Sequence, residues 1–298
     1  MRELEVLLRQ KNIKYLTDVS VAKYSSFKIG GECDIAIFPS TTDELCEALL
    51  AVKERNIKFE VIGNASNILF AFERYYGALI FTSGVDSYCV DGDRIYAECG
   101  ASLVRMANVA KENSLTGLEF ACGIPARIGG AVVMNAGAHG SDASRIIEYT
   151  DAFDMQSGER IRIFDNKYGY RQSIYLENKN LICLGASMKL TQGNKDEIEA
   201  LMRQNLEKRR ASQPIELPSA GSYFKRPEGD FAGRLIEECG LKGERIGGAE
   251  VSTKHAGFIV NVGGASFSDV LALEEKIKER VMSRFGVMLH REVRLIGN

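Results

Sequence analysis

Glycines, gathered in two stretches, are the residues of this chain best placed to bind a charged ligand. The 298 residues include 29 glycines but only 5 prolines, which is not the composition of a flexible linker. Six glycines fall within residues 117–140 and ten within residues 219–264. Glycine permits positive φ and close approach of the main chain, so backbone amides in such loops can surround a diphosphate. The same glycines could serve only tight turns and close packing, and their spacing does not decide between these readings.

The common phosphate-binding motifs are missing. The chain has no G-x-G-x-x-G after its first strand and no G-x-x-x-x-G-K-[ST], and it lacks the G-x-S-x-G of a nucleophile elbow. Two loops remain, one within residues 61–70 (VIGNASNILF) and one within the first glycine stretch. Two separate loops could hold one elongated dinucleotide from different sides.

Cysteine and histidine spacing gives no sign of a metal. The 7 cysteines form no C-x-x-C pair, and the 3 histidines form no H-E-x-x-H. A zinc site or a disulfide framework needs regular, closely spaced pairs. We therefore expect no catalytic metal, and buried reduced thiols as in a cytoplasmic protein.

Charge and hydropathy limit the partners. Lys plus Arg total 38 and Asp plus Glu total 40, whereas a nucleic-acid-binding protein needs a basic excess. The uncharged runs at residues 128–141 and 255–268 are glycine-rich and shorter than about 18 apolar residues, so no membrane span is expected. The charged start MRELE has no apolar signal-peptide core. We expect a cytoplasmic protein without nucleic-acid partners.

Local signals predict strands and helices that alternate along the chain. Thr41 and Glu44 have the spacing of a helix capping box, and Asp91-Gly92 is a hairpin turn signal. The expected strands cover residues 33–38, 58–62, 78–82, 88–90, 94–99, 145–155, 159–164, 181–190, 258–262 and 287–296. The expected helices cover residues 41–55, 102–113, 194–210, 231–239 and 268–285. A charge-dense helix followed by a proline-containing segment places a domain boundary near residues 192–212.

Seven motifs appear in order and give the chain a family resemblance. They are VIGNASNILF, GLEFACGIPARIGGAVVMNAGAHG, YRQS, PSAGSYFKRPEG, AGRLIEECGLKG, IGGAEVSTKHAGFIVN and HREVRLIG. Together they resemble the UDP-N-acetylenolpyruvoylglucosamine reductases, the MurB family, in its shorter type II form. The resemblance runs from about Tyr24 to Gly297.

The resemblance implies an α+β fold with two domains. Residues 1–192 would form a PCMH-type (vanillyl-alcohol-oxidase-like) FAD-binding region of two subdomains. Residues 193–298 would form a smaller α/β substrate-binding domain that includes the final strand. The protein would be a monomer or a weak oligomer.

The resemblance also implies where FAD binds. The residues carried over are Gly63, Asn64, Ala65, Ser66, Asn67, Ile68, Ile124, Pro125, Ala126, Arg127, Ile128, Gly129, Gly130, Asn135 and Gly137. Two positions depart from the commonest family pattern: Ala65 replaces a usual glycine, and Ala126-Arg127 replaces glycine and a small hydroxyl residue. A positive φ at either alanine would cost about 1 kcal/mol, and Arg127 would compensate if it faced the diphosphate.

The implied reaction reduces an enolpyruvyl ether of a UDP-sugar to a lactyl ether in peptidoglycan precursor synthesis. NADPH is the co-substrate, and a hydride passes through FAD N5. Arg171 would stabilise the substrate carboxylate as an enolate forms, and Glu292 would act near it as a proton donor or electrostatic partner. Ser222 would protonate the carbon. Tyr170 and Lys225 would bind the substrate.

Two rival functions share part of this pattern. A PCMH-type flavin oxidase of another substrate would have the N-terminal loops but not the Ser222 and Glu292 motifs. A catalytically silent flavin- or nucleotide-binding protein would follow if the changes at Ala65 and Ala126 disable the cofactor site.

Overall fold

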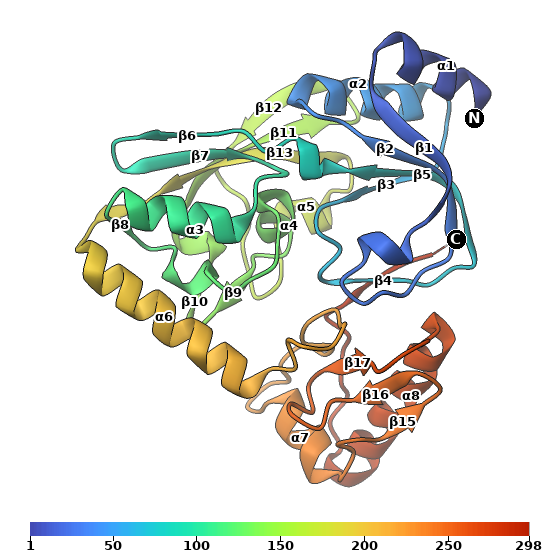
Figure 1. Cartoon of the computed structure of the whole chain (residues 1–298), viewed down its shortest axis with the longest axis vertical. Helices are drawn as coiled ribbons and strands as arrows, with labels where there is room; N and C mark the ends of the chain where they lie inside the picture. Colours follow the sequence, from blue (N-terminus) through green and yellow to red (C-terminus); the bar gives the residue numbers. More distant parts are fainter. Residues whose placement is uncertain (298) are drawn as a thin grey trace. The chain divides into compact units, whose positions relative to one another are not determined.

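A computed structural model describes residues 1–297 and divides them into two compact units. Unit 1 comprises residues 1–17, 35–64 and 77–208, and unit 2 comprises residues 18–34, 65–76 and 209–298. One division falls between Lys208 and Arg209, so residues 193–208 belong to unit 1, and two short N-terminal segments belong to unit 2. Figure 1 gives the order of the elements along the chain.

The larger sheet of unit 1 is antiparallel, with the strand order β12-β11-β13-β7-β6. Two of its connections are hairpins: β6 and β7 join at Gly92 (φ 58°), as predicted, and β11 and β12 join near Gly158 (φ 79°). Glycine adopts such left-handed turns without steric cost. The strands are β6 (Tyr88–Asp91), β7 (Arg94–Glu98), β11 (Ile147–Asp154), β12 (Glu159–Ile163) and β13 (Leu181–Lys189).

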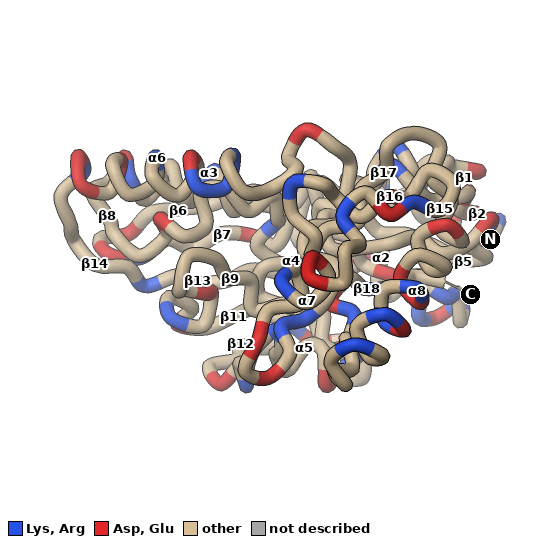
Figure 2. Tube along the Cα trace, turned by 90° about the horizontal axis from the view of Figure 1, so that it is seen from below, with Lys and Arg blue, Asp and Glu red and all other residues tan. Residues whose placement is uncertain are grey.

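Helices pack against this sheet. Ser102 caps α3, because its side chain accepts a hydrogen bond from Arg105 N at 3.3 Å. Buried side chains of α3 and α4 join those of β7 and β13 in one apolar cluster. Along the exposed face of α6, Figure 2 shows basic and acidic residues interspersed, as expected for a solvated helix. The helices are α3 (Leu103–Glu112), α4 (Ile128–Val133), α5 (Ile174–Glu177) and α6 (Lys195–Ser212).

A second sheet has the order β1-β2-β5-β3. Its strands are β1 (Lys14–Ser20), β2 (Glu32–Phe38), β3 (Phe59–Ile62) and β5 (Arg74–Phe81), and the division into units falls within β1, β2 and β5. In unit 1, helices α1 (Arg2–Gln10) and α2 (Thr42–Glu54) lie side by side against it (Figure 1). Thr41 caps α2, as predicted, by accepting from Glu44 N at 3.1 Å.

Unit 2 combines a small antiparallel sheet with two helices. The strand order is β15-β16-β17, and the helices α7 and α8 pack together through an apolar core. Gly286 ends α8 in the left-handed conformation (φ 66°), as its position predicts. The elements are α7 (Ala232–Glu238), β15 (Arg245–Ile246), β16 (Ala249–Val251), β17 (Ile259–Asn261) and α8 (Phe267–Phe285).

The predicted final strand is wrong in length. Only β18 (Arg294–Ile296) is regular, paired in parallel with β4 (Ile68–Phe70), and Arg291 forms a single antiparallel bridge with Phe224. The ladder is short because successive parts of the segment pair with different partners: Arg291 pairs with Phe224, and residues 294–296 pair with β4.

Several short elements were not predicted from the sequence. In addition to α1, β1, β15 and β16, they include β8 (Leu115–Thr116), β9 (Gly137–Ala138), β10 (Ser141–Asp142) and β14 (Thr191–Gln192). Five cysteines are buried as expected, but Cys89 is exposed and Cys239 is half-buried, and all seven thiols are free. Within residues 1–297, no helix has the length and apolarity needed to cross a bilayer.

Candidate active-site residues

The two loops expected to hold a dinucleotide meet within unit 1. The Asn64 side-chain amide donates a hydrogen bond to the carbonyl oxygen of Pro125 at 2.8 Å. A methyl group on Gly63 would lie 3.4 Å from Arg127 Cβ, at ordinary van der Waals distance. The loop after β3 therefore lies against residues 125–127, although they are about 60 positions apart in the chain.

Residues 126–129 are anchored by a second pairing with residues 99–103. Gly129 N donates to Cys99 O at 2.8 Å, and Leu103 N donates to Ala126 O at 3.0 Å. The Arg127 guanidinium donates to Gly100 O at 3.0 Å, so part of its hydrogen bonding supports this loop. A rigid loop with exposed main chain is the scaffold that a diphosphate needs.

The neighbouring glycines Gly129 and Gly130 differ in role. A Cβ added at Gly129 would lie 3.0 Å from Cys99 Cβ, so this glycine is needed for packing. A Cβ added at Gly130 would meet nothing within 4 Å, so the main chain there is open to a ligand. Packing and ligand access therefore coexist in the first turn of α4.

Two alanines depart from the common family pattern, and only Ala65 has a strained backbone conformation. Ala65 has φ of 47° and is 3% exposed, whereas Ala126 is not among the residues with positive φ. The carbonyl oxygen of Ala65 accepts from Ser26 Oγ at 3.2 Å, and the same hydroxyl lies 2.7 Å from Ser219 O. These contacts hold the loop in a conformation that an alanine disfavours by about 1–2 kcal/mol.

The end of this loop joins the chain terminus. Arg294 N donates to Asn67 O at 3.0 Å, and the Asn67 amide donates to Glu292 O at 3.3 Å. Ile68 then pairs with Arg294 in the β4–β18 ladder. The Asn67 side chain is thus used to fix the backbone at Glu292.

Asn135 organises the segment that carries Arg171. Asn135 is 3% exposed and has φ of 41°. Its amide nitrogen donates to Gly169 O at 3.0 Å, and its amide oxygen accepts from Ser144 N at 3.0 Å. The Arg171 guanidinium donates to Asn135 O at 3.3 Å and to Gly137 O at 3.2 Å. The Asn135 side chain therefore bonds within the protein, and the segment around it orients the Arg171 guanidinium.

A buried polar cluster stabilises the chain just before and just after the YRQS motif. Thr150 Oγ1 donates to Asn166 Oδ1 at 2.7 Å and lies 2.6 Å from the hydroxyl of Tyr175. Asn166 O in turn accepts from Ile174 N at 2.8 Å. Tyr170 is 55% exposed, with its ring centroid 5.2 Å from the Arg171 guanidinium carbon. The sequence motif YRQS thus sits on a fixed loop.

Ser222 and Glu292 lie on paired segments of unit 2. Glu292 N donates to Tyr223 O at 2.9 Å, and Lys225 N donates to His290 O at 2.8 Å. Ser222 is exposed, while Glu292 is half-buried. The structure therefore brings together two residues that are 70 positions apart.

His255 and Lys254, for which the sequence suggested no role, support neighbouring loops. His255 Nδ1 accepts from Gly257 N at 3.0 Å, and burial lowers the His255 pKa. Gly257 O accepts from Tyr223 N at 2.8 Å, so His255 sustains the loop next to Ser222. Lys254 Nζ donates to Arg210 O at 2.7 Å.

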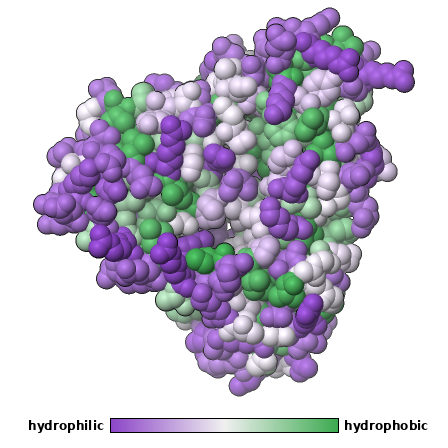
Figure 3. All heavy atoms as spheres, viewed as in Figure 1, coloured by the Kyte–Doolittle hydropathy of each residue, from purple (hydrophilic) through white to green (hydrophobic). Residues whose placement is uncertain are grey.

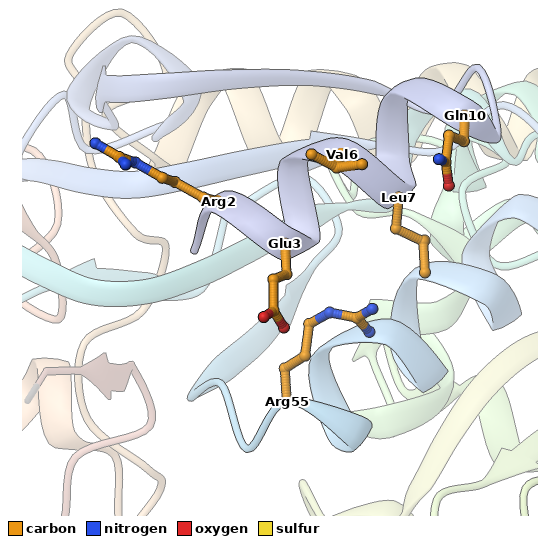
Figure 4. Close-up of a pocket in the computed structure, with 6 residues that line it drawn as sticks. All are labelled: Arg2, Glu3, Val6, Leu7, Gln10 and Arg55. Atoms are coloured by element: carbon orange, nitrogen blue, oxygen red, sulfur yellow. The ribbon is translucent and has the colours of Figure 1, made fainter.

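One groove on the surface lies away from the expected site residues. Hydrophilic residues predominate on the face seen in Figure 3, and hydrophobic ones form separate patches. A groove of about 360 Å³ lies between α1 and the end of α2, with Glu3 and Arg55 on facing sides (Figure 4), and none of the expected site residues line it. Among residues 1–297, no three His, Cys, Asp or Glu side chains are grouped to hold a metal ion.

Comparison with known families defines the class of the protein. Residues 33–163 match the FAD binding domain, and residues 213–296 match the C-terminal domain of UDP-N-acetylenolpyruvoylglucosamine reductase. The segment of residues 124–130 runs into the first turn of α4, where no side chain covers Gly130, and the start of a helix can receive a diphosphate. The chain is an FAD-binding oxidoreductase of α+β fold, with a PCMH-type cofactor region and a smaller α/β domain.

Full-length relatives identify the family. The chain is 43% identical over 298 residues to UDP-N-acetylenolpyruvoylglucosamine reductase of Caldanaerobacter subterraneus subsp. tengcongensis, covering 99% of this chain and 97% of the relative. The enzyme of Caldicellulosiruptor bescii is 42% identical, with 99% and 95% covered. The crystal structure of MurB from Thermus caldophilus superposes with a TM-score of 0.80 at 30% identity, covering 96% of this chain and 99% of that one. The chain belongs to the UDP-N-acetylenolpyruvoylglucosamine reductase family.

Proposed function

We propose that Arg171, Ser222 and Glu292 are the catalytic residues of this family's reaction. The chain reduces the enolpyruvyl ether of UDP-N-acetylglucosamine to UDP-N-acetylmuramate, with NADPH as the reductant, in peptidoglycan precursor synthesis. Bound FAD supplies the carrier that passes a hydride from NADPH to the vinyl carbon of the substrate. The protein must then stabilise the negative charge that grows on the neighbouring carbon and carboxylate, and it must deliver a proton.

Arg171 is proposed to bind the substrate carboxylate. Its guanidinium is always cationic, and its planar fork matches two carboxylate oxygens. The hydrogen bonds to Asn135 O and Gly137 O restrict its rotation, so little reorganisation is needed as charge develops. Tyr170 and Lys225 are proposed to bind the rest of the substrate.

Ser222 is proposed to give the proton to carbon. A serine hydroxyl is a weak acid, so its position relative to the carbanionic carbon must supply much of the effect. Glu292 is proposed to act beside the carboxylate, as a proton donor or as an electrostatic partner. The observation that carries this assignment is the Glu292 N–Tyr223 O hydrogen bond of 2.9 Å, which pairs the two segments bearing Ser222 and Glu292.

The residues proposed to hold FAD are those of the two loops and their supports. Asn64, Pro125 and Arg127 form the contacts between the loops, and Gly130 leaves the main chain open. Asn135 and Gly137 are proposed to shape the site through the segment that they stabilise. The alanine at position 65 is compatible with this role, because the loop adopts the left-handed conformation despite it.

The nucleotide substrates and the free, mostly buried thiols support a cytoplasmic enzyme. We propose a monomer or a weak oligomer, to be tested by light scattering of the purified chain. For the reaction itself, the full chain reconstituted with FAD should show flavin absorbance and, without oxygen, should consume NADPH beyond the amount that reduces the bound FAD only when the enolpyruvyl substrate is added. NADPH consumption that requires oxygen would favour a flavin oxidase instead, and the absence of flavin bands would favour a catalytically silent protein.

A further inference from the structure

We propose that Glu274, a buried carboxylate on α8, is a positioning residue that fixes Ser222 and Glu292 through Tyr223 and Arg291. The inference rests on the proposed function, because it concerns two residues assigned to catalysis there. Glu274 itself is 0% exposed, so it acts only through its neighbours.

One oxygen of Glu274 joins the two site segments. Glu274 Oε2 accepts from the Tyr223 hydroxyl at 2.8 Å and from Arg291 Nε at 2.7 Å. The other oxygen, Oε1, lies 2.5 Å from Lys278 Nζ in an ion pair one turn along the helix. The carboxylate thus connects α8 to both segments at once.

The residues bound by Glu274 are direct chain neighbours of the proposed catalytic residues. Tyr223 follows Ser222, and Arg291 precedes Glu292. The two segments are also paired through the Phe224–Arg291 bridge. Because one carboxylate holds the side chains of both Tyr223 and Arg291, it also restricts the backbone at their chain neighbours Ser222 and Glu292.

The charge state of the cluster suits this role. Burial alone raises the pKa of Glu274, but hydrogen bonds from Arg291, Lys278 and Tyr223 outweigh it and hold the pKa below its usual value. Burial raises the pKa of Tyr223, so its hydroxyl stays protonated and donates. The carboxylate is therefore ionised, and it accepts the hydrogen bonds that Tyr223 and Arg291 donate.

Stability alone does not account for a carboxylate at this position. Glu274 lies within the buried stripe of α8 that contains Val270, Leu273, Ile277 and Val281. An apolar residue would suit that stripe, because buried ion pairs are often no more stabilising than well-packed apolar side chains. What an apolar residue would not supply is directional bonding to Tyr223 and Arg291, which selects one arrangement of the two segments.

The experiment compares the full FAD-bound chain with Tyr223→Phe and Glu274→Gln variants. Stopped-flow absorbance, without oxygen, separates the reduction of the enzyme by NADPH from its reoxidation by the enolpyruvyl substrate. Tyr223→Phe keeps the ring, which packs edge-to-face on Phe224 with 5.2 Å between ring centroids. It removes only the hydrogen bond from the hydroxyl to Glu274. We expect reoxidation to slow by about tenfold or more, with NADPH reduction within about twofold of wild type. Equal slowing of both steps, or of neither, would overturn the proposal.

A combined variant separates positioning from stability. Glu274→Leu, combined with Tyr223→Phe, Arg291→Met and Lys278→Met, replaces every polar side chain of the cluster by an apolar one, a change that leaves such sites equally or more stable in other proteins. The proposal expects wild-type thermal stability with reoxidation still slowed by about tenfold. Wild-type reoxidation in this variant would show that the network only stabilises. Lys276→Met is the matched control, since it removes the Lys276–Glu244 ion pair of the same helix (2.6 Å) and should alter neither step.

Hydrogen exchange tests the positioning independently of the reaction. In Tyr223→Phe, the amides of residues 222–225 and 290–293 should exchange faster than in wild type and in Lys276→Met. Unchanged protection in these two segments would overturn the proposal. A wild-type enzyme that fails to reoxidise with the enolpyruvyl substrate would instead overturn the proposed function, and the exchange result would still decide the role of Glu274.

Discussion

The backbone N–H of Glu292 donates a hydrogen bond to the carbonyl oxygen of Tyr223, with 2.9 Å between nitrogen and oxygen. This bond places Glu292 beside the segment that carries Ser222. The Asn67 side chain, in the loop after β3, donates to the Glu292 carbonyl oxygen, so both the N–H and the C=O of Glu292 are hydrogen-bonded. The pairing supports the proposal that the serine and the glutamate act on one substrate.

Replacing Ser222 should affect only one of the two steps. Ser222→Ala removes the proposed proton donor, so we expect reoxidation by the enolpyruvyl substrate to slow by on the order of 10² or more. Reduction by NADPH, measured by stopped-flow, should remain close to wild type. Ser222→Cys keeps an acidic hydrogen and should lose less. If the alanine variant slowed both steps equally, Ser222 would have a structural role.

Ala65→Gly should stabilise the protein. Ala65 has φ of 47°, and glycine relieves a strain of about 1–2 kcal/mol there but adds about 0.4–1 kcal/mol of unfolded-state entropy. The free energy of unfolding in urea, with FAD in excess, should rise by up to about 1 kcal/mol. Ala126→Gly is the matched control, because that residue has no positive φ and the change should destabilise. A loss of stability in Ala65→Gly would refute this account of the loop.

Asn135→Ala should weaken both the fold and the reaction. The change removes two hydrogen bonds of 3.0 Å from a buried side chain and leaves an alanine at φ 41°. We expect a loss of about 2–4 kcal/mol in unfolding free energy and slower reoxidation, because the Arg171 segment loosens. Asn108→Ala, on the exposed face of α3, provides the control and should leave both quantities near wild type. Full activity in Asn135→Ala would exclude a link between Asn135 and Arg171.

The pH dependence of stability should report on His255. Burial lowers the pKa of His255 in the folded chain, so the unfolded chain binds the proton more readily. The stabilising effect of the neutral ring is present above the unfolded pKa of about 6.5 and is lost as the pH falls through the lower folded value. In urea unfolding between about pH 7 and 5, His255→Gln should lose less stability than wild type. Identical slopes for the two proteins would contradict this assignment.

Local signals in the sequence predicted much of the fold. The cap at Thr41, the turn at Asp91-Gly92 and the helix end at Gly286 each depend on a few adjacent residues, and all are present in the structure. The strand over residues 287–296 was predicted too long, because its pairing partners, β4 and Phe224, are distant in sequence. Period-two patterning does not specify which strand a segment meets, and therefore not where the pairing ends.

The proposed site residues come from the sequence, but the residues that support them do not. Ser222, Arg171 and Glu292 are proposed from motifs that the family resemblance identifies, whereas Glu274 makes its contacts through the fold. A signal was present: Glu274 is a charged residue within the apolar stripe that includes Leu273 and Ile277. Such a residue indicates a buried ion pair, yet only the structure identifies its partners as Tyr223 and Arg291.

The most direct test of the proposed function is a single turnover without oxygen. The FAD-bound chain is first reduced with one equivalent of NADPH, and UDP-N-acetylglucosamine enolpyruvate is then added. We predict that the oxidised flavin spectrum returns and that about one UDP-N-acetylmuramate forms per FAD, as the stoichiometry of a single hydride transfer requires. A spectrum that stays reduced until oxygen is admitted, with the enolpyruvyl ether unchanged, would contradict the proposed function.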